Sequence, residues 1–301
     1  MNSINIFYGV LMEGMIYGIV SLGTYVAFRI LSIADMTVDG SFPLGMAISA
    51  ILIIKGVPAI LTIPIAMVFG ALSGFITGII HVKLKVRDIL AGIIVMTGLY
   101  SINLRVAGRA NLPIFNYDTI FKNPFIIKLS HDIGMSRDLT KVVLLAIITL
   151  ICKFILDKYL KTRSGYLLKS VGDNETLVTT LSRDKDKLKI LGLAIANSFV
   201  ALGGAINTQD KGFFEISAGT GTLVVAIANV IIGLKIASKF KNLSETTCVL
   251  IGSVLYRLCI SIAISLGMEA VDLKLITALL LLIILILNKD KKKSIKDIKK
   301  V

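Results

Sequence analysis

Apolar residues in this chain are gathered into long blocks separated by polar turns, and this pattern constrains the fold more than any other feature. A block of about 20 apolar residues can cross the hydrocarbon core of a bilayer as one helix. Of the 301 residues, 55% are apolar and 17% are charged, and the mean hydropathy is +0.85. One globular core does not need so large an excess, so we expect an all-α, polytopic integral membrane protein rather than a soluble enzyme.

About nine blocks are expected to form transmembrane or re-entrant helices joined by short loops. The first lacks a basic region and a small-residue cleavage site, so we expect a retained helix rather than a signal peptide. A polar, glycine-interrupted stretch, 34–41, precedes the short second block and predicts a broken or re-entrant helix there. The expected helices span residues 9–31, 42–54, 58–80, 89–107, 139–156, 190–206, 223–236, 247–266 and 273–287.

The net charge of +14 lies in a few short segments, a distribution that predicts which side of the membrane each loop occupies. Basic loops stay in the cytoplasm, so this pattern indicates membrane topology and not a nucleic-acid surface. We expect one transmembrane domain, 1–288, followed by a basic cytoplasmic tail, 289–301, which anchors the topology or contacts anionic lipid. The basic segments are residues 81–88, 158–189, 235–241 and 289–301.

The stretch 108–137 is expected to be the longest connection on the non-cytoplasmic side. It carries a modest positive excess, which the rule for basic loops does not explain.

The sequence carries no sign of metal or nucleotide chemistry. Its three cysteines form no CxxC pair, and its two histidines lie far apart without an HExxH context, so no metal site is expected. The chain has no GxxxxGK[ST] loop, the motif that cradles nucleotide phosphates in ATPases. We therefore expect no cofactor on this chain and no ATP hydrolysis by it.

The most informative polar segment is 161–175, which falls inside a basic, cytoplasmic loop. Leu167, Leu168 and Val171 have helical spacing, and Gly172 suits the left-handed turn that ends a short helix. Asp173 and the asparagine after it are helix-capping residues that start another helix. The pattern predicts a pair of short helices across the cytoplasmic face, fitted to a groove on a soluble partner; a solvated linker is the alternative.

Polar residues within or beside the apolar blocks are the next candidates. Such groups are costly in a membrane and face a bundle interior or a cavity, or they cap helices and bond between them. A small residue at every fourth position of one block predicts a face that another helix approaches closely. The polar candidates are Asp35, Thr37, Asp39, Asn103, Arg105, Asn197 and Asn229, and the small-residue stripe is Gly70, Gly74 and Gly78.

The run 162–175, continued through Leu181 and the stretch 197–205, resembles the permease subunits of ABC importers of the branched-chain amino-acid and ribose type. The chain is most similar to a subgroup paired with lipoprotein receptors for aromatic amino acids. The matches are spread in order over nearly the whole chain. Other matching stretches are residues 33–42, 90–113, 231–236, 253–258 and 272–278.

The resemblance implies an importer in which two permease subunits form the translocation path for a small solute, an amino acid of aromatic or branched-chain type. It implies a cytoplasmic ATPase that binds ATP and Mg, an extracellular substrate-binding lipoprotein, and a second copy of this chain. Asp39, Asn103 and Arg105 are expected to line or gate the path, with Arg105 paired to a carboxylate. The residues that match the ATPase-coupling segment are Arg163, Gly165, Leu168, Val171, Gly172, Asp173, Asn174 and Glu175.

Two other classes of protein remain as alternatives. A stand-alone secondary transporter, driven by an ion gradient, needs carboxylates in the middle of its spans, but the acidic residues here cluster at the ends of the expected helices, Glu13 among them. A membrane enzyme needs a nucleophile, a base or a metal set converging on one face, and two remote histidines do not supply one. The sequence favours the importer permease.

Overall fold

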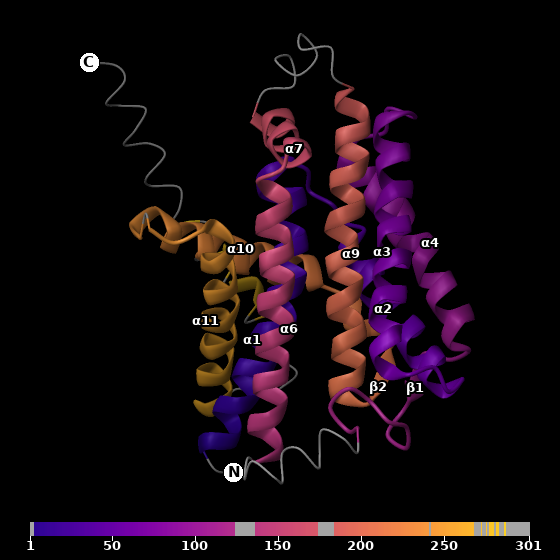
Figure 1. Ribbon diagram of the computed structural model, residues 1–301, viewed down its shortest axis with the longest axis vertical. Helices are drawn as coiled ribbons and strands as arrows, with labels where there is room; N and C mark the ends of the chain where they lie inside the picture. Colours follow the sequence, from indigo (N-terminus) through magenta and orange to yellow (C-terminus); the bar gives the residue numbers. More distant parts are fainter. Residues whose placement is uncertain are drawn as a thin grey trace.

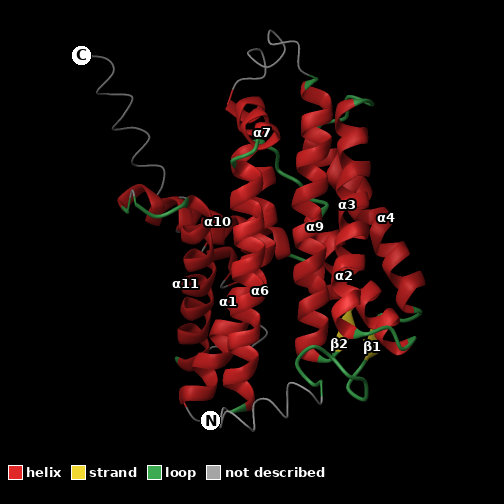
Figure 2. Cartoon of the chain, viewed as in Figure 1, coloured by secondary structure: helices red, strands yellow, loops and turns green. Residues whose placement is uncertain are grey.

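The computed structural model describes residues 3–123, 136–173, 184–240 and 242–267, with isolated positions between 272 and 286. Helices make up almost the whole of this part, with one short strand pair (Figure 2). The elements are α1 Ser3–Tyr25, η1 Val26–Ile30, α2 Val38–Ile54, α3 Ala59–Val82, α4 Asp88–Ala107, β1 Asn111–Pro113, α6 Arg137–Leu160, α7 Arg163–Asp173, α9 Lys185–Lys211, β2 Phe213–Glu215, η2 Ile216–Gly219, α10 Thr222–Lys239 and α11 Glu245–Ser265.

The long helices run side by side, with α7 at one end of the bundle and the β1–β2 pair at the other (Figure 1). We call these the α7 end and the β-pair end. Helix α9 packs on α2 and α3, helix α1 packs on α6, α10 and α11, and the contact between α1 and α9 joins the two groups. Helix α10 lies across the long axis in Figure 1, with its first residues near the middle of the molecule.

Seven helices of the described residues are long and apolar enough to span a membrane, and α2 is a shorter apolar helix. The all-α, polytopic fold expected from the apolar blocks is therefore confirmed. The block expected at 223–236 is longer than predicted, because an apolar helical stretch runs over Ile216–Lys239. The ninth expected span, 273–287, lies almost entirely outside the described residues, so the number nine stays a prediction.

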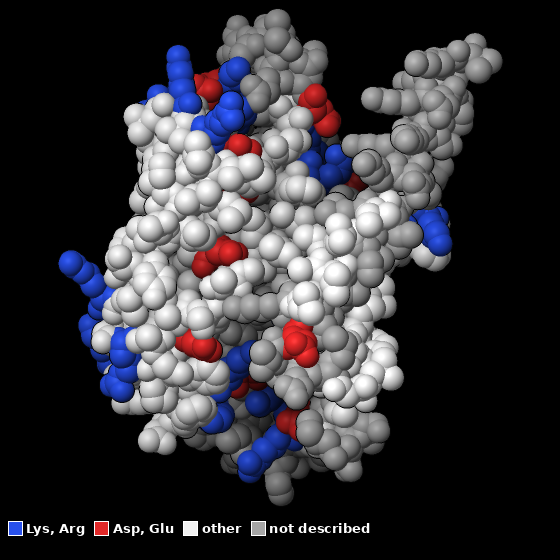
Figure 3. All heavy atoms as spheres, turned by 180° about the vertical axis from the view of Figure 1, so that it is seen from behind, with Lys and Arg blue, Asp and Glu red and all other residues white. Residues whose placement is uncertain are grey.

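Lys and Arg side chains are scarce in the middle of one face of the bundle, where a few Asp and Glu side chains lie among uncharged residues (Figure 3). Lys and Arg side chains gather toward the upper and lower ends of the face drawn in Figure 3, and uncharged residues cover most of the region between them. The turn 83–87, helix α7 and the start of α9 all lie at the α7 end, because α3 and α9 run antiparallel with Gly78 beside Ile190. Two of the expected cytoplasmic segments, 81–88 and 158–189, thus share one end of the molecule.

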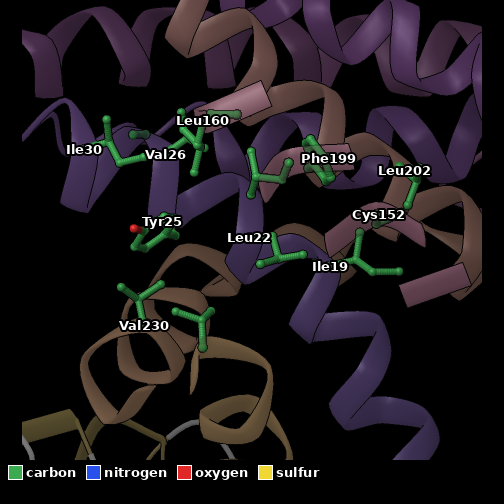
Figure 4. Packing of buried hydrophobic residues seen from close by; sticks show 14 of the residues in the cluster. Ile19, Leu22, Tyr25, Val26, Ile30, Cys152, Leu160, Phe199, Leu202 and Val230 are labelled. Carbon is green, nitrogen blue, oxygen red and sulfur yellow. The ribbon is translucent and has the colours of Figure 1, made fainter. Parts of the chain in front are cut away.

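The interior around α1 is apolar. Ile19, Leu22 and Val26 from the first helix meet Phe199 and Leu202 from α9 in one buried cluster, which Figure 4 shows. Residues from α6, α10 and α11 extend this cluster, so it joins five long helices. Close packing of these side chains stabilises the position of α1 at the centre of the fold.

Small residues bring α3 and α9 into backbone contact. A Cβ atom added at Gly70 would lie 2.4 Å from the Asn197 carbonyl oxygen, and one at Gly74 would lie 2.1 Å from the Leu193 carbonyl oxygen. At Gly78 the added atom would lie 2.8 Å from the Ile190 Cα. The stripe that the sequence singled out therefore lies against α9 along its whole length, and it leaves no room for a side chain.

The chain between the first helix and α2 is irregular and buried. The regular α-helix gives way at Val26 to a short π-helix, which ends at Ile30, and α2 begins only at Val38. Ile33, Asp35 and Thr37 in the connecting segment are buried. Irregular backbone at this depth is tolerated because protein surrounds it, as the polar stretch in the sequence indicated.

A pair of matched glycine substitutions tests the backbone contact between α3 and α9. Gly74→Ala is expected to destabilise the protein by ~1–3 kcal/mol, because the new methyl meets the Leu193 carbonyl. Gly98→Ala in α4, where nothing lies within 4 Å of the added atom, is expected to leave stability unchanged or to raise it by up to ~1 kcal/mol. Thermal unfolding in detergent measures both, and equal midpoints would contradict the packing.

Candidate functional site

Three of the polar candidates from the sequence meet in the buried segment before α2. Asn197 Nδ2 donates a hydrogen bond of 2.6 Å to Asp35 Oδ2, and the Thr37 N–H donates one of 2.9 Å to Asp35 Oδ1. The Thr37 and Thr77 hydroxyl groups lie 2.7 Å apart. Asp35, Thr37 and Asn197 are almost completely buried, so this network fastens the irregular segment to α3 and α9.

Asp39 holds the beginning of α10 beside the beginning of α2. Its Oδ1 accepts a hydrogen bond of 2.8 Å from the Leu223 N–H, and its Oδ2 accepts one of 3.0 Å from the Gly221 N–H. Gly221 has a φ of 86°, so the chain turns there in the left-handed region that favours glycine. The carboxylate satisfies N–H groups at a helix start, where the helix dipole also favours a negative charge.

Asn103 fixes α4 beside the same point. Its Nδ2 donates a hydrogen bond of 3.1 Å to the Gly40 carbonyl oxygen, while its Oδ1 has no partner among the residues that the structure describes. A Cβ atom at Gly40 would lie 3.0 Å from a methyl group of Leu99, so α2 and α4 are in close contact there. Asp39 and Asn103, which the sequence analysis expects to line or gate the path, are therefore neighbours.

A cavity of about 310 Å³ opens between α2, α4 and η2 beside these two side chains. Tyr100 stands at its edge with 54% of its surface exposed, and Thr97 is exposed on the same face of α4. The wall thus combines a buried amide, a carboxylate that caps a helix, and an aromatic ring. The cavity is lined by Met36, Asp39, Gly40, Pro43, Met96, Thr97, Tyr100, Asn103, Ile216 and Thr220.

Two other candidates lie apart from this cavity. Arg105 is exposed near the end of α4, and no ion pair involves it within the described part of the chain, so the carboxylate partner expected for it is not found there. Asn229 is buried in α10, where its Nδ2 donates a hydrogen bond of 2.9 Å to the Ser21 hydroxyl group. This bond joins α10 to α1.

A charged cluster that the sequence did not indicate lies near the β-pair end. Glu13 pairs with Arg257 at 3.0 Å and with Lys211 at 3.5 Å, and the Arg257 guanidinium lies 4.0 Å from the centre of the Tyr17 ring. The sequence reading placed Glu13 near the end of its helix, which is wrong, because α1 begins at Ser3 and Glu13 falls well inside it. Its two cationic partners explain how a carboxylate is tolerated there.

The described residues of the coupling segment before position 174 form a helix, α7, whose inner face is packed on the chain's own transmembrane helices, and the second short helix that the sequence predicts lies outside the described residues. Gly165, Leu168 and Val171 are buried, whereas Arg163 and Asp173 are exposed and Tyr166 is 60% exposed. The buried residues therefore hold α7 in place, and the exposed face is the part open to another molecule. Two further residues that the sequence assigned to this segment, Asn174 and Glu175, lie outside the described residues.

The sequence predicted that Gly172 forms the left-handed turn that ends this helix, and that prediction is wrong. Helix α7 continues through Gly172 to Asp173, and Gly172 does not have a positive φ. A Cβ atom at Gly172 would lie 1.7 Å from the Ile30 carbonyl oxygen and 3.2 Å from the Leu31 Cα. The glycine is needed for close contact with the end of the first transmembrane helix, just before the segment that carries Asp35.

Metal binding has no support in this site. No group of three or more His, Cys, Asp or Glu side chains that could hold a metal ion occurs within the described residues. Cys152 and Cys248 are buried, and Cys259 is exposed on α11. The site is built from hydrogen bonds, helix ends and aromatic side chains.

The fold and site define a polytopic helical protein with a buried polar centre and a short helix docked at one end. Residues 6–287 match the model of a family described as branched-chain amino acid transport system / permease component. The chain belongs to this family, so it is a permease of the ABC importer type.

Three relatives illustrate the range of the family. The chain is 38% identical to a tyrosine transport system permease protein of Clostridioides difficile, over 91% of this chain and 88% of the relative. It is 30% identical to an uncharacterized protein of Rickettsia prowazekii, over 87% and 90% of the two chains. It is 26% identical to a ribose import permease protein of Haemophilus influenzae, over 74% and 67%. No solved structure matches the chain at a significant level.

The hydrogen bonds of Asp39 predict a specific loss of stability. Asp39→Ala leaves two N–H groups at the start of α10 without an acceptor and is expected to cost ~0.5–2 kcal/mol. Asp186→Ala, which removes an exposed carboxylate from the first turn of α9, is the matched control and is expected to change stability by less than ~0.5 kcal/mol. Unfolding midpoints in detergent compare the two variants, and an Asp39→Ala midpoint equal to that of the control would contradict the capping role.

Proposed function

We propose that this chain forms the translocation path of an ABC importer for an aromatic amino acid, with tyrosine as the first substrate to test. The observation that carries the substrate class is the 38% identity with the tyrosine transport system permease, which extends over 91% of this chain. The chemistry of the cavity supports it: Tyr100, Met36 and Met96 offer aromatic and sulfur contacts, and the Asn103 amide offers a hydrogen bond.

A separate cytoplasmic ATPase supplies the energy in this proposal, with ATP and Mg bound on that partner. The chain itself lacks the GxxxxGK[ST] loop that nucleotide hydrolysis of this kind requires. The ATPase docks on the exposed face of α7, which presents Arg163, Tyr166 and Asp173. An exposed tyrosine beside an arginine is typical of residues that dominate the energy of protein interfaces.

The packing of α7 suggests how movement of the ATPase reaches the path. Gly172 lies against the Ile30 carbonyl and Leu31, so a displacement of α7 pushes directly on the segment that ends the first helix. That segment carries Asp35, whose hydrogen bonds join it to α9, and it leads into α2 with Asp39. The start of α10 would move together with Asp39, because two hydrogen bonds join them. In this proposal the connected segments switch between two arrangements, as coupling of this kind requires.

Two copies of the chain surround the path in this proposal, and an extracellular lipoprotein delivers the substrate. The cavity beside Asp39 opens toward the exposed residues Thr97 and Tyr100 of α4, the face that a second copy would cover. The α7 end faces the cytoplasm of a cell whose plasma membrane holds the protein, because basic segments gather there. The receptor therefore meets the β-pair end.

A stand-alone secondary transporter, driven by an ion gradient, is the second candidate. It would need a membrane carboxylate that exchanges its ion during transport. Glu13 is inside a helix, but Arg257 and Lys211 already compensate its charge. Asp35 and Asp39 already accept hydrogen bonds that hold neighbouring segments in place. The importer proposal is therefore favoured, and the two are separated by whether an ATPase binds.

Co-expression with an ATPase encoded beside this chain, followed by recovery of the complex in detergent, tests the docking face. Tyr166→Ala is expected to lower ATPase recovery at least about fivefold without moving the unfolding midpoint, because the ring is 60% exposed and its contact with Lys169 is at the surface. Tyr117→Ala at the β-pair end is the matched control, with expected recovery equal to that of the unaltered protein. Failure of the folded, unaltered protein to bind any such ATPase would contradict the importer and favour the secondary transporter.

A further inference from the structure

A second and larger cavity lies between α3 and α6. Its volume is about 1,090 Å³, and Phe199 and Leu202 of α9 contribute to its wall. Ile60 on α3 and Ile151 on α6 also line it, and they are 68% and 52% exposed, so the groove opens onto the surface that a bilayer would cover. We call it the α3–α6 groove. Figure 4 shows Phe199, Leu202 and Cys152, three of its residues, within the apolar cluster.

A polar pocket of about 460 Å³ adjoins this groove toward the β-pair end. The two share Tyr117, Asp118 and Leu144, so one continuous depression changes from apolar to charged along its length. Lys122, Arg137 and Lys141 contribute cations to the pocket, and Asp118 and Asp138 contribute carboxylates.

Aromatic rings hold two of these cations at the pocket. Lys122 Nζ lies 5.9 Å from the centre of the Phe115 ring, and Lys141 Nζ lies 6.0 Å from the centre of the Phe121 ring. Lys141 also pairs with Asp210 at 3.4 Å, so Lys122 and Arg137 are the cations with charge to offer a ligand. The pocket also adjoins the first turn of α6, whose helix dipole favours a bound anion.

We propose that this depression binds one anionic phospholipid, with an acyl chain in the α3–α6 groove and the phosphate beside Lys122 and Arg137. A phospholipid changes from an apolar acyl chain to a charged headgroup, in the same order as the walls change from apolar to charged. Basic pockets between transmembrane helices can bind anionic headgroups. The site also explains the positive excess of the 108–137 connection, which the rule for basic loops does not explain. With the α7 end in the cytoplasm, this lipid belongs to the outer leaflet.

The absence of tryptophan from the chain makes a direct test simple. Ile151→Trp places a single reporter on the wall of the groove, and Phe154→Trp, on the same helix, places one at an exposed position outside it. Each full-length variant is reconstituted in phosphatidylcholine nanodiscs with rising fractions of either brominated phosphatidylglycerol or brominated phosphatidylcholine. Bromine quenches tryptophan only on contact, so the fraction that gives half-maximal quenching reports which lipid occupies the site.

At Ile151→Trp, half-maximal quenching is expected at a fraction of phosphatidylglycerol about fivefold below that of phosphatidylcholine, the preference that one basic side chain beside an anionic headgroup provides. The Phe154→Trp reporter is expected to respond equally to the two lipids. Adding Lys122→Gln and Arg137→Gln to Ile151→Trp is expected to remove the preference. Ile155→Trp, also on the groove wall, serves as a second reporter if Ile151→Trp does not fold.

Two results would overturn the proposal. Equal quenching of Ile151→Trp by both lipids would mean that the groove holds only bulk lipid. Quenching of Phe154→Trp but not of Ile151→Trp or Ile155→Trp would mean that protein, and not lipid, fills the groove.

Discussion

Backbone contact between α9 and its neighbours is the constraint on which the rest of this structure depends. A Cβ atom added at Gly45 of α2 would lie 1.9 Å from the Ala201 carbonyl oxygen, and one at Gly204 would lie 2.0 Å from the Phe42 carbonyl oxygen. With the stripe on α3, these contacts make α2, α3 and α9 one tightly packed unit. In a membrane, where the hydrophobic effect adds little between helices, such close packing is a main source of helix association.

The polar groups of the centre depend on this packing. Because α9 packs closely on α2 and α3, Asn197 reaches Asp35 just before α2. For the same reason Gln209, near the end of α9, bonds to Ser49 of α2 and Thr62 of α3. The next two residues of α9 extend the same role at the β-pair end: Asp210 pairs with Lys141 of α6, and the following lysine pairs with α1. Helix α9 thus connects α2 and α3 with α1 and α6.

The sequence predicted the fold class and most helices, because apolar blocks of this length have few other structures open to them in a membrane. It also identified Asp35, Asp39 and Asn197 as costly polar groups. It could not show that Asp35 bonds to Asn197, since the two lie 162 positions apart and only tertiary packing brings them together. Gly172 was misread for a related reason: a glycine near a helix end resembles a cap, whereas here it makes room for Ile30.

The most direct measurement is uptake of labelled tyrosine into proteoliposomes that contain this chain, its ATPase and its receptor protein. The account predicts accumulation that needs ATP and the receptor and that is insensitive to collapse of ion gradients. Because Asp39 holds the start of α10 beside the cavity, the same account predicts slower uptake for Asp39→Ala at equal protein content. Uptake by this chain alone, driven by an ion gradient and indifferent to ATP, would contradict it.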